Sequence, residues 1–334
     1  MSDDPALLGA DCLTASPREA RLDVSSLCQL ECARCPVMER NGRPFVGRGL
    51  MAVADFARFV DLNPRIRVIE LGNSGEVFLN PGLPRLLRAA AERDVSIRIG
   101  EGANLNDATA EALEALVLYG VMVLRVAVDG VTQETYARYR VGGDLQKVLA
   151  NIRRINEYKA TLGSDRPRLI LQFIPFGHNE QEMDKAVVLG RMMGMEVDFK
   201  LNTFPGAFPL RDPAAVSRRL GYSDKTSYLE KTGKVYMREV CLQLWRAPQV
   251  NWDGRLLGCS TNVWESYADN VLGGAFATEV NNERIRHARR MLMGQAPARD
   301  DIPCSRCESF ADYREHGQWF RPDELRAAMR RESP

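Results

Sequence analysis

Strand-like and helical segments alternate between residues 21 and 201, and this alternation restricts the possible folds most strongly. Short apolar or β-branched runs predict strands at 21–24, 67–71, 95–99, 121–128, 169–174 and 196–201. Helical periodicity predicts helices at 81–93, 107–119 (N-cap Asn106 or Asp107), 132–160 (interrupted by Gly142 and Gly143) and 180–193. Repeated strand–helix units form parallel sheets with right-handed crossovers. Six units in about 180 residues favour an α/β fold with a partial (β/α)6 TIM-like barrel over a closed barrel of eight units.

Three cysteines, Cys28, Cys32 and Cys35, follow the first predicted strand. Ligands of such sheets bind at the carboxyl ends of the strands, so this loop lies where a site is expected. Three thiolates on one loop can bind zinc, copper(I) or an iron–sulfur cluster. A structural zinc site takes four ligands, and the nearest histidine in the sequence is the distant His178. A [4Fe–4S] cluster with one open iron therefore explains the spacing best. The alternative is a cysteine-rich loop without redox function.

Composition and charge exclude several classes of function. The net charge of +1 and the pI of about 7.5 create no field that would attract nucleic acid or an anionic membrane. No apolar stretch approaches the roughly 18 residues of a membrane span, and the acidic N-terminus lacks the features of a signal peptide. We therefore expect a cytoplasmic protein without nucleic-acid or membrane partners. Eight cysteines in such a chain indicate metal binding or catalysis more than disulfides.

The spacing CxxxCxxC resembles the signature of the radical S-adenosylmethionine (SAM) enzymes, and the resemblance covers about residues 20–310. In that family the loop binds a [4Fe–4S] cluster, whose open iron chelates the amine and the carboxylate of SAM. An external one-electron reductant, such as a flavodoxin or a ferredoxin-like protein, drives cleavage of SAM to methionine and a 5′-deoxyadenosyl radical. That radical abstracts a hydrogen atom from the substrate. The resemblance thus implies SAM and a [4Fe–4S] cluster as cofactors.

The sequence GNSGE after the second strand resembles the glycine-rich segment that binds the SAM amino group in this family. It contains Ser74, Gly75 and Glu76. Glycine lets the backbone approach a ligand closely, and a carboxylate can pair with an ammonium group. A plain turn is the alternative interpretation.

The ends of the third and fourth strands resemble two further SAM-binding segments. The sequence GEGANL contains Asn104 and resembles a TNGxxL segment, with Glu101 in place of the usual asparagine. The sequence AVDG, followed by Tyr136 and Arg140, resembles a segment in which the arginine binds the SAM carboxylate. A solvent-facing helix charge is the alternative for Arg140.

Polar residues within the apolar strands are candidates for catalysis. Gln172 and Lys200 interrupt otherwise apolar runs. Because buried polar groups need partners, each faces either a ligand cavity or another internal polar group. Glu101 is a third candidate, as a group that accepts a proton. Asn202 is a weaker candidate of the same kind, and His178 is expected in a surface loop.

A second group of cysteines comprises Cys241, Cys259, Cys304 and Cys307. Asp253-Gly254 predicts a hairpin turn between strand-like runs at 248–252 and 256–258. A hairpin with thiolates near its base and a later CxxC gathers four sulfurs, and metal chemistry alone favours zinc for such a set. The order of the motifs resembles the twitch domain, a shortened SPASM domain. That resemblance implies a second, auxiliary [4Fe–4S] cluster bound by all four cysteines.

The sequence thus predicts a partial barrel followed by a small iron–sulfur twitch domain with a β-hairpin. The expected segments are an N-terminal lead-in at 1–20, the radical SAM barrel at 21–202, a linker or lid at 203–239, the twitch domain at 240–320, and a solvated C-terminal helix and tail at 321–334.

The resemblance implies radical chemistry on a small molecule, such as a sugar, an aminocyclitol or a nucleoside-like biosynthetic intermediate. A fully ligated auxiliary cluster has no open iron, so we expect it to accept an electron while the substrate is oxidised by two electrons. An epimerase is an alternative, but it needs a thiol donor, and Cys12 is the only cysteine outside the two groups. Decarboxylation is another alternative. Peptide modification is disfavoured because only about 20 residues precede the barrel. A non-catalytic iron–sulfur electron carrier is the alternative from a different class.

Overall fold

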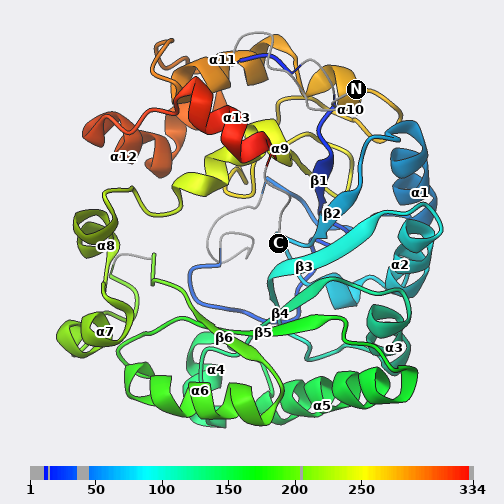
Figure 1. The fold of residues 1–334 in the computed structure, drawn as a ribbon, viewed down its shortest axis with the longest axis vertical. Coiled ribbons are helices and arrows are strands. Elements are labelled where there is room, and N and C mark those ends of the chain that lie inside the picture. The colour runs from blue at the N-terminus through cyan, green and yellow to red at the C-terminus, as the bar shows by residue number, and fades with distance from the viewer. Residues whose placement is uncertain (1–10, 14–15, 36–44, 204–205, 331–334) are drawn as a thin grey trace.

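Strand β4 (Val123–Ala127) shows why the centre of the sheet is apolar. The computed structural model describes residues 11–13, 16–35, 45–203 and 206–330. Four of the five residues of β4 are buried, because helices cover the convex face of the sheet and the strand has a neighbour on each side (Figure 1). A strand in that position requires a nearly continuous apolar sequence.

The strands within the described residues run parallel in one curved sheet (Figure 1). They are β1 (Glu19–Leu22), β2 (Val68–Leu71), β3 (Ser96–Ala103), β4, β5 (Arg168–Phe173), β6 (Glu196–Phe199) and β7 (Gln249–Val250). Their order across the sheet is β6-β5-β4-β3-β2-β1-β7, so the described strands do not close into a barrel. The predicted α/β partial barrel is confirmed. Strand β7 extends it beyond the six predicted strands.

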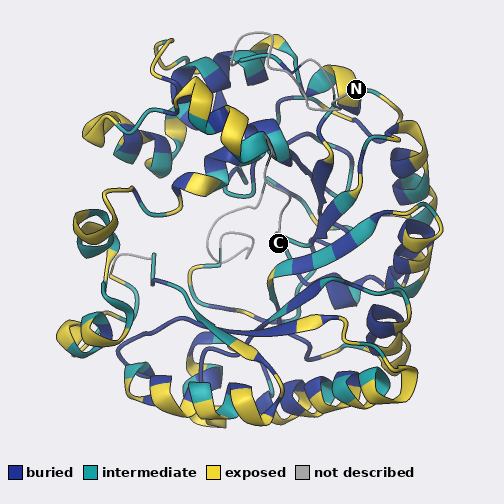
Figure 2. Ribbon diagram, in the orientation of Figure 1, coloured by how far each residue is buried: buried dark blue, intermediate teal, exposed yellow. Residues whose placement is uncertain are grey.

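The helices that accompany these strands lie mostly on the convex side of the sheet (Figure 1). They are α1 (Val53–Leu62), α2 (Leu83–Ala91), α3 (Ala110–Leu118), α4 (Gln133–Tyr139), α5 (Leu145–Leu162) and α6 (Met183–Met192). Helix α1 packs on α2, and α3 packs on α5. Exposed residues follow the outward faces of α5 and α6 (Figure 2). None of the helices in the described part of the chain has the length and apolar character to cross a membrane.

Two details of this region differ from the sequence prediction. Helix α1 was not predicted. The N-cap of α3 is Thr109, whose side chain accepts the Ala112 N–H at 3.2 Å, so the predicted caps Asn106 and Asp107 are wrong. Asn106 instead donates to the hydroxyl of Tyr136 at 2.9 Å, which keeps it out of the helix.

The segment predicted as an irregular linker contains two helices, α7 (Pro213–Leu220) and α8 (Lys225–Thr232). Each begins after an aspartate, Asp212 or Asp224, whose side chain accepts a first-turn backbone N–H. Each ends at a glycine with positive φ. The caps were present in the sequence, but these helices bury almost no side chains, so they lack a periodic apolar pattern.

The C-terminal region adds short helices beside the end of the sheet that carries β1 and β7 (Figure 1). They are α9 (Gln243–Arg246), α10 (Phe276–Glu279), α11 (Glu283–Leu292), α12 (Glu308–His316) and α13 (Pro322–Arg330). The predicted hairpin is present as an antiparallel bridge between Val250 and Leu256. Gly254 lies in its turn with a φ of 90°. Because β7 also pairs with β1, this region is joined to the barrel by backbone hydrogen bonds.

Side-chain contacts hold both ends of the described chain against the C-terminal region. The N–H of Leu13 donates to Asn281 Oδ1 at 2.9 Å, and Asn281 Nδ2 donates to Leu13 O at 2.8 Å. In α13, Leu325 is fully buried and Glu324 pairs with Arg238. The prediction of a loose lead-in is therefore wrong for residues 11–13. The predicted C-terminal helix is present as α13, and most of its described residues are exposed or half-buried, while Leu325 anchors it. Residues 1–10 and 331–334 lie outside the described residues.

Candidate functional site

The loop after β1 carries Cys28, Cys32 and Cys35. Cys32 is buried, and the other two are half-buried. The N–H groups of Ser26 and Glu31 donate to backbone carbonyls of distant loops at 3.0 and 2.9 Å, which fixes the loop. Burial, and to a smaller extent the other two thiols, raises the pKa of Cys28 to about 12. Thiols grouped in this way stay protonated unless a positively charged metal centre replaces the protons.

The glycine-rich segment after β2 packs directly on this cysteine loop. The N–H of Glu76 donates to Leu27 O at 2.7 Å. Gly75 has a φ of 80°, and a Cβ at this position would lie 2.6 Å from Ser26 C and 2.7 Å from Leu27 O. Only glycine fits this backbone conformation and this close approach.

Glu76 connects the cysteine loop to the end of β3. Its carboxylate accepts the Asn104 N–H at 2.7 Å and the Phe78 N–H at 3.3 Å. Burial raises the pKa of Glu76 to about 7. Asn104 Nδ2 in turn donates to Cys28 Sγ at 3.9 Å, and Gln29 Nε2 donates to Asn104 Oδ1 at 3.0 Å. Two of the predicted cofactor contacts are thus hydrogen-bonded to each other beside a cysteine of the loop.

Arg140, at the end of α4, lies on the other side of the loop. Its Nε donates to Asp129 Oδ2 at 2.7 Å, and its Nη1 donates to Cys32 Sγ at 3.6 Å. Burial lowers the pKa of Arg140, but Asp129 and Cys32 raise it by more, so the guanidinium is permanently charged. The structure therefore places a fixed positive charge in contact with the cysteine loop.

Asp23, which directly follows β1, organises the glycine-rich segment. Its Oδ1 accepts the N–H groups of Asn73 and Ser74 at 2.7 and 2.9 Å. The side chain is fully buried, and burial raises the pKa of Asp23 to about 6. Within the described residues, neither Asp23 Oδ2 nor Ser74 Oγ has a hydrogen-bond partner. Asp23 was not among the predicted site residues, although an acidic residue at the end of an apolar strand marks the edge where sites form.

The three candidates for catalysis are Glu101 in β3, Gln172 in β5 and Lys200, which directly follows β6. Glu101 forms an ion pair with Arg21 of β1, and 37% of the Glu101 side chain is exposed. Burial lowers the pKa of Lys200, and Glu101 partly opposes that change. Gln172 is buried, and a Cβ on Gly102 would lie 3.1 Å from its Oε1. In the described structure this Oε1 has no hydrogen-bond partner.

Of two weaker predictions, that for His178 is wrong, whereas Asn202 follows the predicted alternative of an internal partner. His178 is buried rather than part of a surface loop, and its ring stacks on Phe176 with 5.5 Å between centroids. Neither of its ring nitrogens has a partner among the described residues. Asn202 Nδ2 donates to Ala207 O at 2.8 Å, a local contact within its own loop.

The second group of cysteines lines a single cavity of the C-terminal region. The lining includes Cys241, Cys259, Cys304 and Cys307, together with the apolar side chains of Leu244, Leu292 and Phe310. The first three cysteines are buried and Cys307 is half-buried. Burial, followed by Cys307, raises the pKa of Cys259 to about 11. The cavity thus gathers four thiols in surroundings that disfavour free thiolates.

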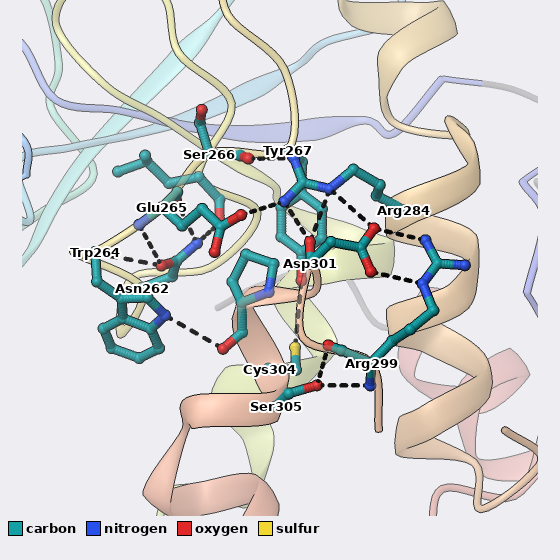
Figure 3. A network of polar contacts seen from close by, with 12 residues as sticks. Asn262, Trp264, Glu265, Ser266, Tyr267, Arg284, Arg299, Asp301, Cys304 and Ser305 are labelled. Carbon is teal, nitrogen blue, oxygen red and sulfur yellow. Dashed lines mark hydrogen bonds and ion pairs between the residues drawn. The ribbon is translucent and has the colours of Figure 1, made fainter. Parts of the chain in front are cut away.

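A network of arginine contacts fixes one wall of this cavity (Figure 3). Arg284 donates to Ser266 O at 2.7 Å and pairs with Glu265 at 2.5 Å. Arg299 pairs with Asp301 at 2.7 Å. Arg284 also donates to the backbone oxygen of Asp301 at 2.9 Å. These contacts join the segment around residue 265 to the turn that carries the last two cysteines.

Two tyrosine hydroxyls reach the thiols of the cavity. The Tyr267 hydroxyl and Cys304 Sγ are hydrogen-bonded at 3.3 Å (Figure 3). Tyr313 is fully buried beside Cys241. Its hydroxyl interacts with the Cys241 thiol, and burial together with this thiol raises the pKa of Tyr313.

Among the residues that the structure describes, no group of three or more His, Cys, Asp or Glu side chains meets the geometry of a site for one metal ion.

Backbone and side-chain hydrogen bonds connect the two cysteine groups. Asn73 Nδ2, in the glycine-rich segment, donates to Ser260 O at 2.9 Å. On the other side of Cys259, the N–H of Gly258 donates to Gln249 O of β7 at 3.1 Å, and β7 pairs with β1. Cys259 is therefore held between the cofactor segment and the first strand.

Cys12 lies apart from both groups. Its Sγ donates to Leu13 O at 3.8 Å, in the segment that Asn281 binds. Arg289, which is fully buried in the C-terminal region, donates to the adjacent Asp11 O at 3.0 Å. Cys12 thus belongs to the N-terminal segment that packs on the C-terminal region.

Neither a protein-family model nor a curated protein matches this chain. Among solved structures, BtrN in complex with AdoMet and 2-DOIA has a TM-score of 0.46 and 13% identity, covering 84% of this chain and 87% of that chain. Methylornithine synthase (PylB) has a TM-score of 0.45 and 14% identity, covering 90% of this chain and 86% of that chain. Coproporphyrinogen III oxidase (HemN) from Escherichia coli, described as a radical SAM enzyme, has a TM-score of 0.44 and 11% identity, covering 65% and 53%. With TM-scores below 0.5, these likenesses leave the function to be argued from the residues of the chain itself.

Proposed function

We propose that the chain is a radical SAM enzyme that binds a [4Fe–4S] cluster through Cys28, Cys32 and Cys35. One observation carries the proposal. Three segments that resemble SAM-binding segments, following β2, β3 and β4, all contact the same cysteine loop: the glycine-rich segment through its backbone, Asn104 at Cys28, and Arg140 at Cys32. When bound, the cluster and SAM supply a 5′-deoxyadenosyl radical that removes a hydrogen atom from the substrate.

The side chains around the loop suit the two charged ends of a methionine moiety. Asp129 holds Nε and Nη2 of Arg140, and Nη1 points to Cys32. This nitrogen is the donor that can reach a carboxylate bound beside the cysteines. Glu76 accepts one backbone N–H at each oxygen, and each oxygen retains a second lone pair for an ammonium group.

The inside of the sheet suits a small polar substrate. Gln172 offers a buried amide oxygen, which has no partner among the described residues, to a hydroxyl or amine donor. Burial raises the pKa of Glu101, but Arg21 and Lys200 lower it by more, so Glu101 is ionised at neutral pH. We propose that Glu101 accepts the proton that the substrate loses on oxidation. A sugar, an aminocyclitol or a nucleoside-like molecule has the hydroxyl groups that these contacts require.

We further propose that the second cysteine group binds an auxiliary [4Fe–4S] cluster and that the reaction is a two-electron oxidation. When bound, that cluster supplies an acceptor for one electron. Four thiols lining one cavity support a fully ligated centre. The position of Cys12 supports oxidation over epimerisation, because an epimerase needs a thiol beside the substrate radical. The backbone groups on both sides of Cys12, at Asp11 and Leu13, are hydrogen-bonded to Arg289 and Asn281 of the C-terminal region.

Anaerobic reconstitution with iron and sulfide tests this function. We expect about eight irons per chain, and 5′-deoxyadenosine after addition of reductant and SAM. A protein that carries its full iron content and forms no 5′-deoxyadenosine would not be a radical SAM enzyme. With candidate substrates, oxidation gives a product two mass units lighter. Epimerisation leaves the mass unchanged in ordinary water and adds one deuterium in heavy water.

A further inference from the structure

The cavity of the second cysteine group contains a hydroxyl donor whose position suggests a specific role. We propose that the hydroxyl of Tyr267 donates to the thiolate of Cys304 and thereby raises the reduction potential of the auxiliary cluster. This inference rests on the proposed function, because it requires that cluster. Tyr267 is a positioning residue in this account, since it contacts a ligand of the cluster and no substrate.

The contact between Tyr267 and Cys304 is direct and shielded from solvent. The hydroxyl oxygen lies 3.3 Å from Cys304 Sγ, and both residues are buried, with 4% and 8% exposure. A thiolate in these surroundings has little access to water as an alternative donor. The tyrosine hydroxyl therefore supplies a hydrogen bond that solvent cannot replace.

The backbone fixes the tyrosine in this orientation. The N–H of Tyr267 donates to Leu256 O at 2.7 Å, next to the bridge between Leu256 and Ala268. The ring lies over Gly258, where a Cβ would stand 2.7 Å from the ring carbon Cε2. Gly258 also has a φ of 82°. Gly258 directly precedes Cys259. Its lack of a side chain leaves room for the Tyr267 ring, whose hydroxyl contacts Cys304.

A charged group also lies near the Tyr267 ring. The guanidinium of Arg284 lies 5.7 Å from the centroid of the Tyr267 ring and is held by Glu265 and Ser266 (Figure 3). A cation over the ring withdraws electron density from the phenol. The hydroxyl is then a stronger donor to the sulfur than it would be without Arg284.

A hydrogen bond to a ligating thiolate changes the balance between the two oxidation states of a cluster. The sulfur carries more negative charge in the reduced state, so a donor stabilises that state more and raises the reduction potential. A higher potential makes the auxiliary cluster a better acceptor for the electron that leaves the substrate. Tyr267 would in this way favour oxidation without contacting the substrate.

The test is a redox titration of the full-length chain, followed by electron paramagnetic resonance. The triple variant Cys28→Ala, Cys32→Ala, Cys35→Ala serves as the background, because it retains only the auxiliary cluster. We expect Tyr267→Phe to shift the midpoint potential negatively. The expected change in the ratio of reduced to oxidised cluster at fixed potential is about tenfold, which equals about 59 mV for a one-electron couple. Tyr228→Phe, in helix α8, is the matched control and should not change the potential.

The outcomes separate this proposal from the proposed function. If the triple variant binds no iron, the auxiliary cluster itself is absent and the proposed function fails at that point. If Tyr267→Phe binds about four irons and keeps the potential of its background, the role of Tyr267 is overturned. If Tyr267→Phe does not retain iron, 3-fluorotyrosine at position 267 replaces it, since this residue keeps the shape and donates more strongly. A positive shift then supports the proposal, and an unchanged or negative potential overturns it.

Discussion

The two cysteine groups lie in surroundings of opposite character. Two of the three cysteines after β1 are half-buried, and charged or polar side chains contact them: Arg140 at Cys32 and Asn104 at Cys28. Three of the four cysteines in the C-terminal cavity are buried among apolar side chains. The polar groups at their sulfurs include the uncharged hydroxyls of Tyr267 and Tyr313 and the backbone N–H groups of Thr261 and Asn262.

This difference indicates what each group can bind. A centre that accepts an external, charged ligand needs an open coordination position and fixed charges of both signs around it, as Glu76 and Arg140 provide. A centre that only exchanges electrons is better served by complete ligation and by neutral donors that adjust its potential. The first group therefore has the features of an open site and the second those of a closed site.

Removal of the first group should have the largest effect. We expect the triple variant Cys28→Ala, Cys32→Ala, Cys35→Ala to lose all formation of 5′-deoxyadenosine, because these three cysteines are the proposed ligands of the cluster that binds SAM. About half of the iron should remain, in the second group. Iron and sulfide analysis, together with chromatography of the nucleoside, measures both quantities. Loss of all iron would show that the two groups do not act as separate sites.

Removal of the second group should separate SAM cleavage from oxidation. The variant Cys304→Ala, Cys307→Ala should still form 5′-deoxyadenosine, because the contacts around the first loop remain. It should yield little oxidised product, since the closed site no longer accepts the electron. The ratio of oxidised product to 5′-deoxyadenosine is the measurement. An unchanged ratio would contradict the role given to the second group.

A single substitution in the open site, at Arg140, should have a smaller effect, on the affinity for SAM alone. Arg140→Lys removes the planar donor that Asp129 orients, so we expect affinity for SAM to fall by about 10- to 100-fold, as for residues that contact metal ligands. Arg138→Lys on the same helix, where the side chain is exposed, is the matched control. Equilibrium binding of SAM to the reconstituted protein measures the effect. Equal affinities for both variants would remove Arg140 from the proposed SAM site.

The smallest expected effect is a pH dependence of the free energy of unfolding, caused by Asp23. Burial raises the pKa of Asp23 to about 6 in the folded chain, against roughly 3.9 in an unfolded one. The folded state then binds the proton more tightly, so the free energy of unfolding is highest below about pH 4 and falls as the pH rises to about 6. Asp23→Asn keeps the oxygen that accepts from Asn73 and Ser74 and removes this slope.

Chemical unfolding at about pH 5 and about pH 7 measures this difference. Relative to Asp23→Asn, the unchanged protein should lose on the order of 1 kcal/mol of stability between these values. Parallel pH profiles for the two proteins would mean that Asp23 does not carry a raised pKa. The closed site, whose hydroxyl donors do not titrate in this range, should show no such dependence.

The sequence predicted the parts of the structure that leave a periodic or covalent pattern. Strands β2 to β6 were predicted from short apolar or β-branched runs, and their parallel order followed from the alternation with helices. The cysteine spacings and the glycine-rich segment identified segments that the structure brings together, such as Gly75 and the loop after β1. The functional roles of these residues stay predictions.

Features that depend on tertiary contacts could not be predicted in the same way. Strand β7 has two residues, and its pairing with β1 bridges more than 220 positions of sequence, as in the pair Arg21–Gln249. Asp23 carries no motif, and its importance comes from the backbone N–H groups that another strand brings to it. The burial of His178 depends on ring contacts with Phe176 and Phe208, which lie in two different loops. Such contacts are set by the packing of the whole barrel.

The most direct test of the contrast between an open and a closed site is electron paramagnetic resonance of the reduced protein with and without SAM. The account predicts two cluster signals. Addition of SAM should change the signal that disappears in the Cys28→Ala, Cys32→Ala, Cys35→Ala variant, and it should leave the signal that disappears in Cys304→Ala, Cys307→Ala unchanged. A single cluster signal, or an effect of SAM on the signal of the second group, would contradict the account.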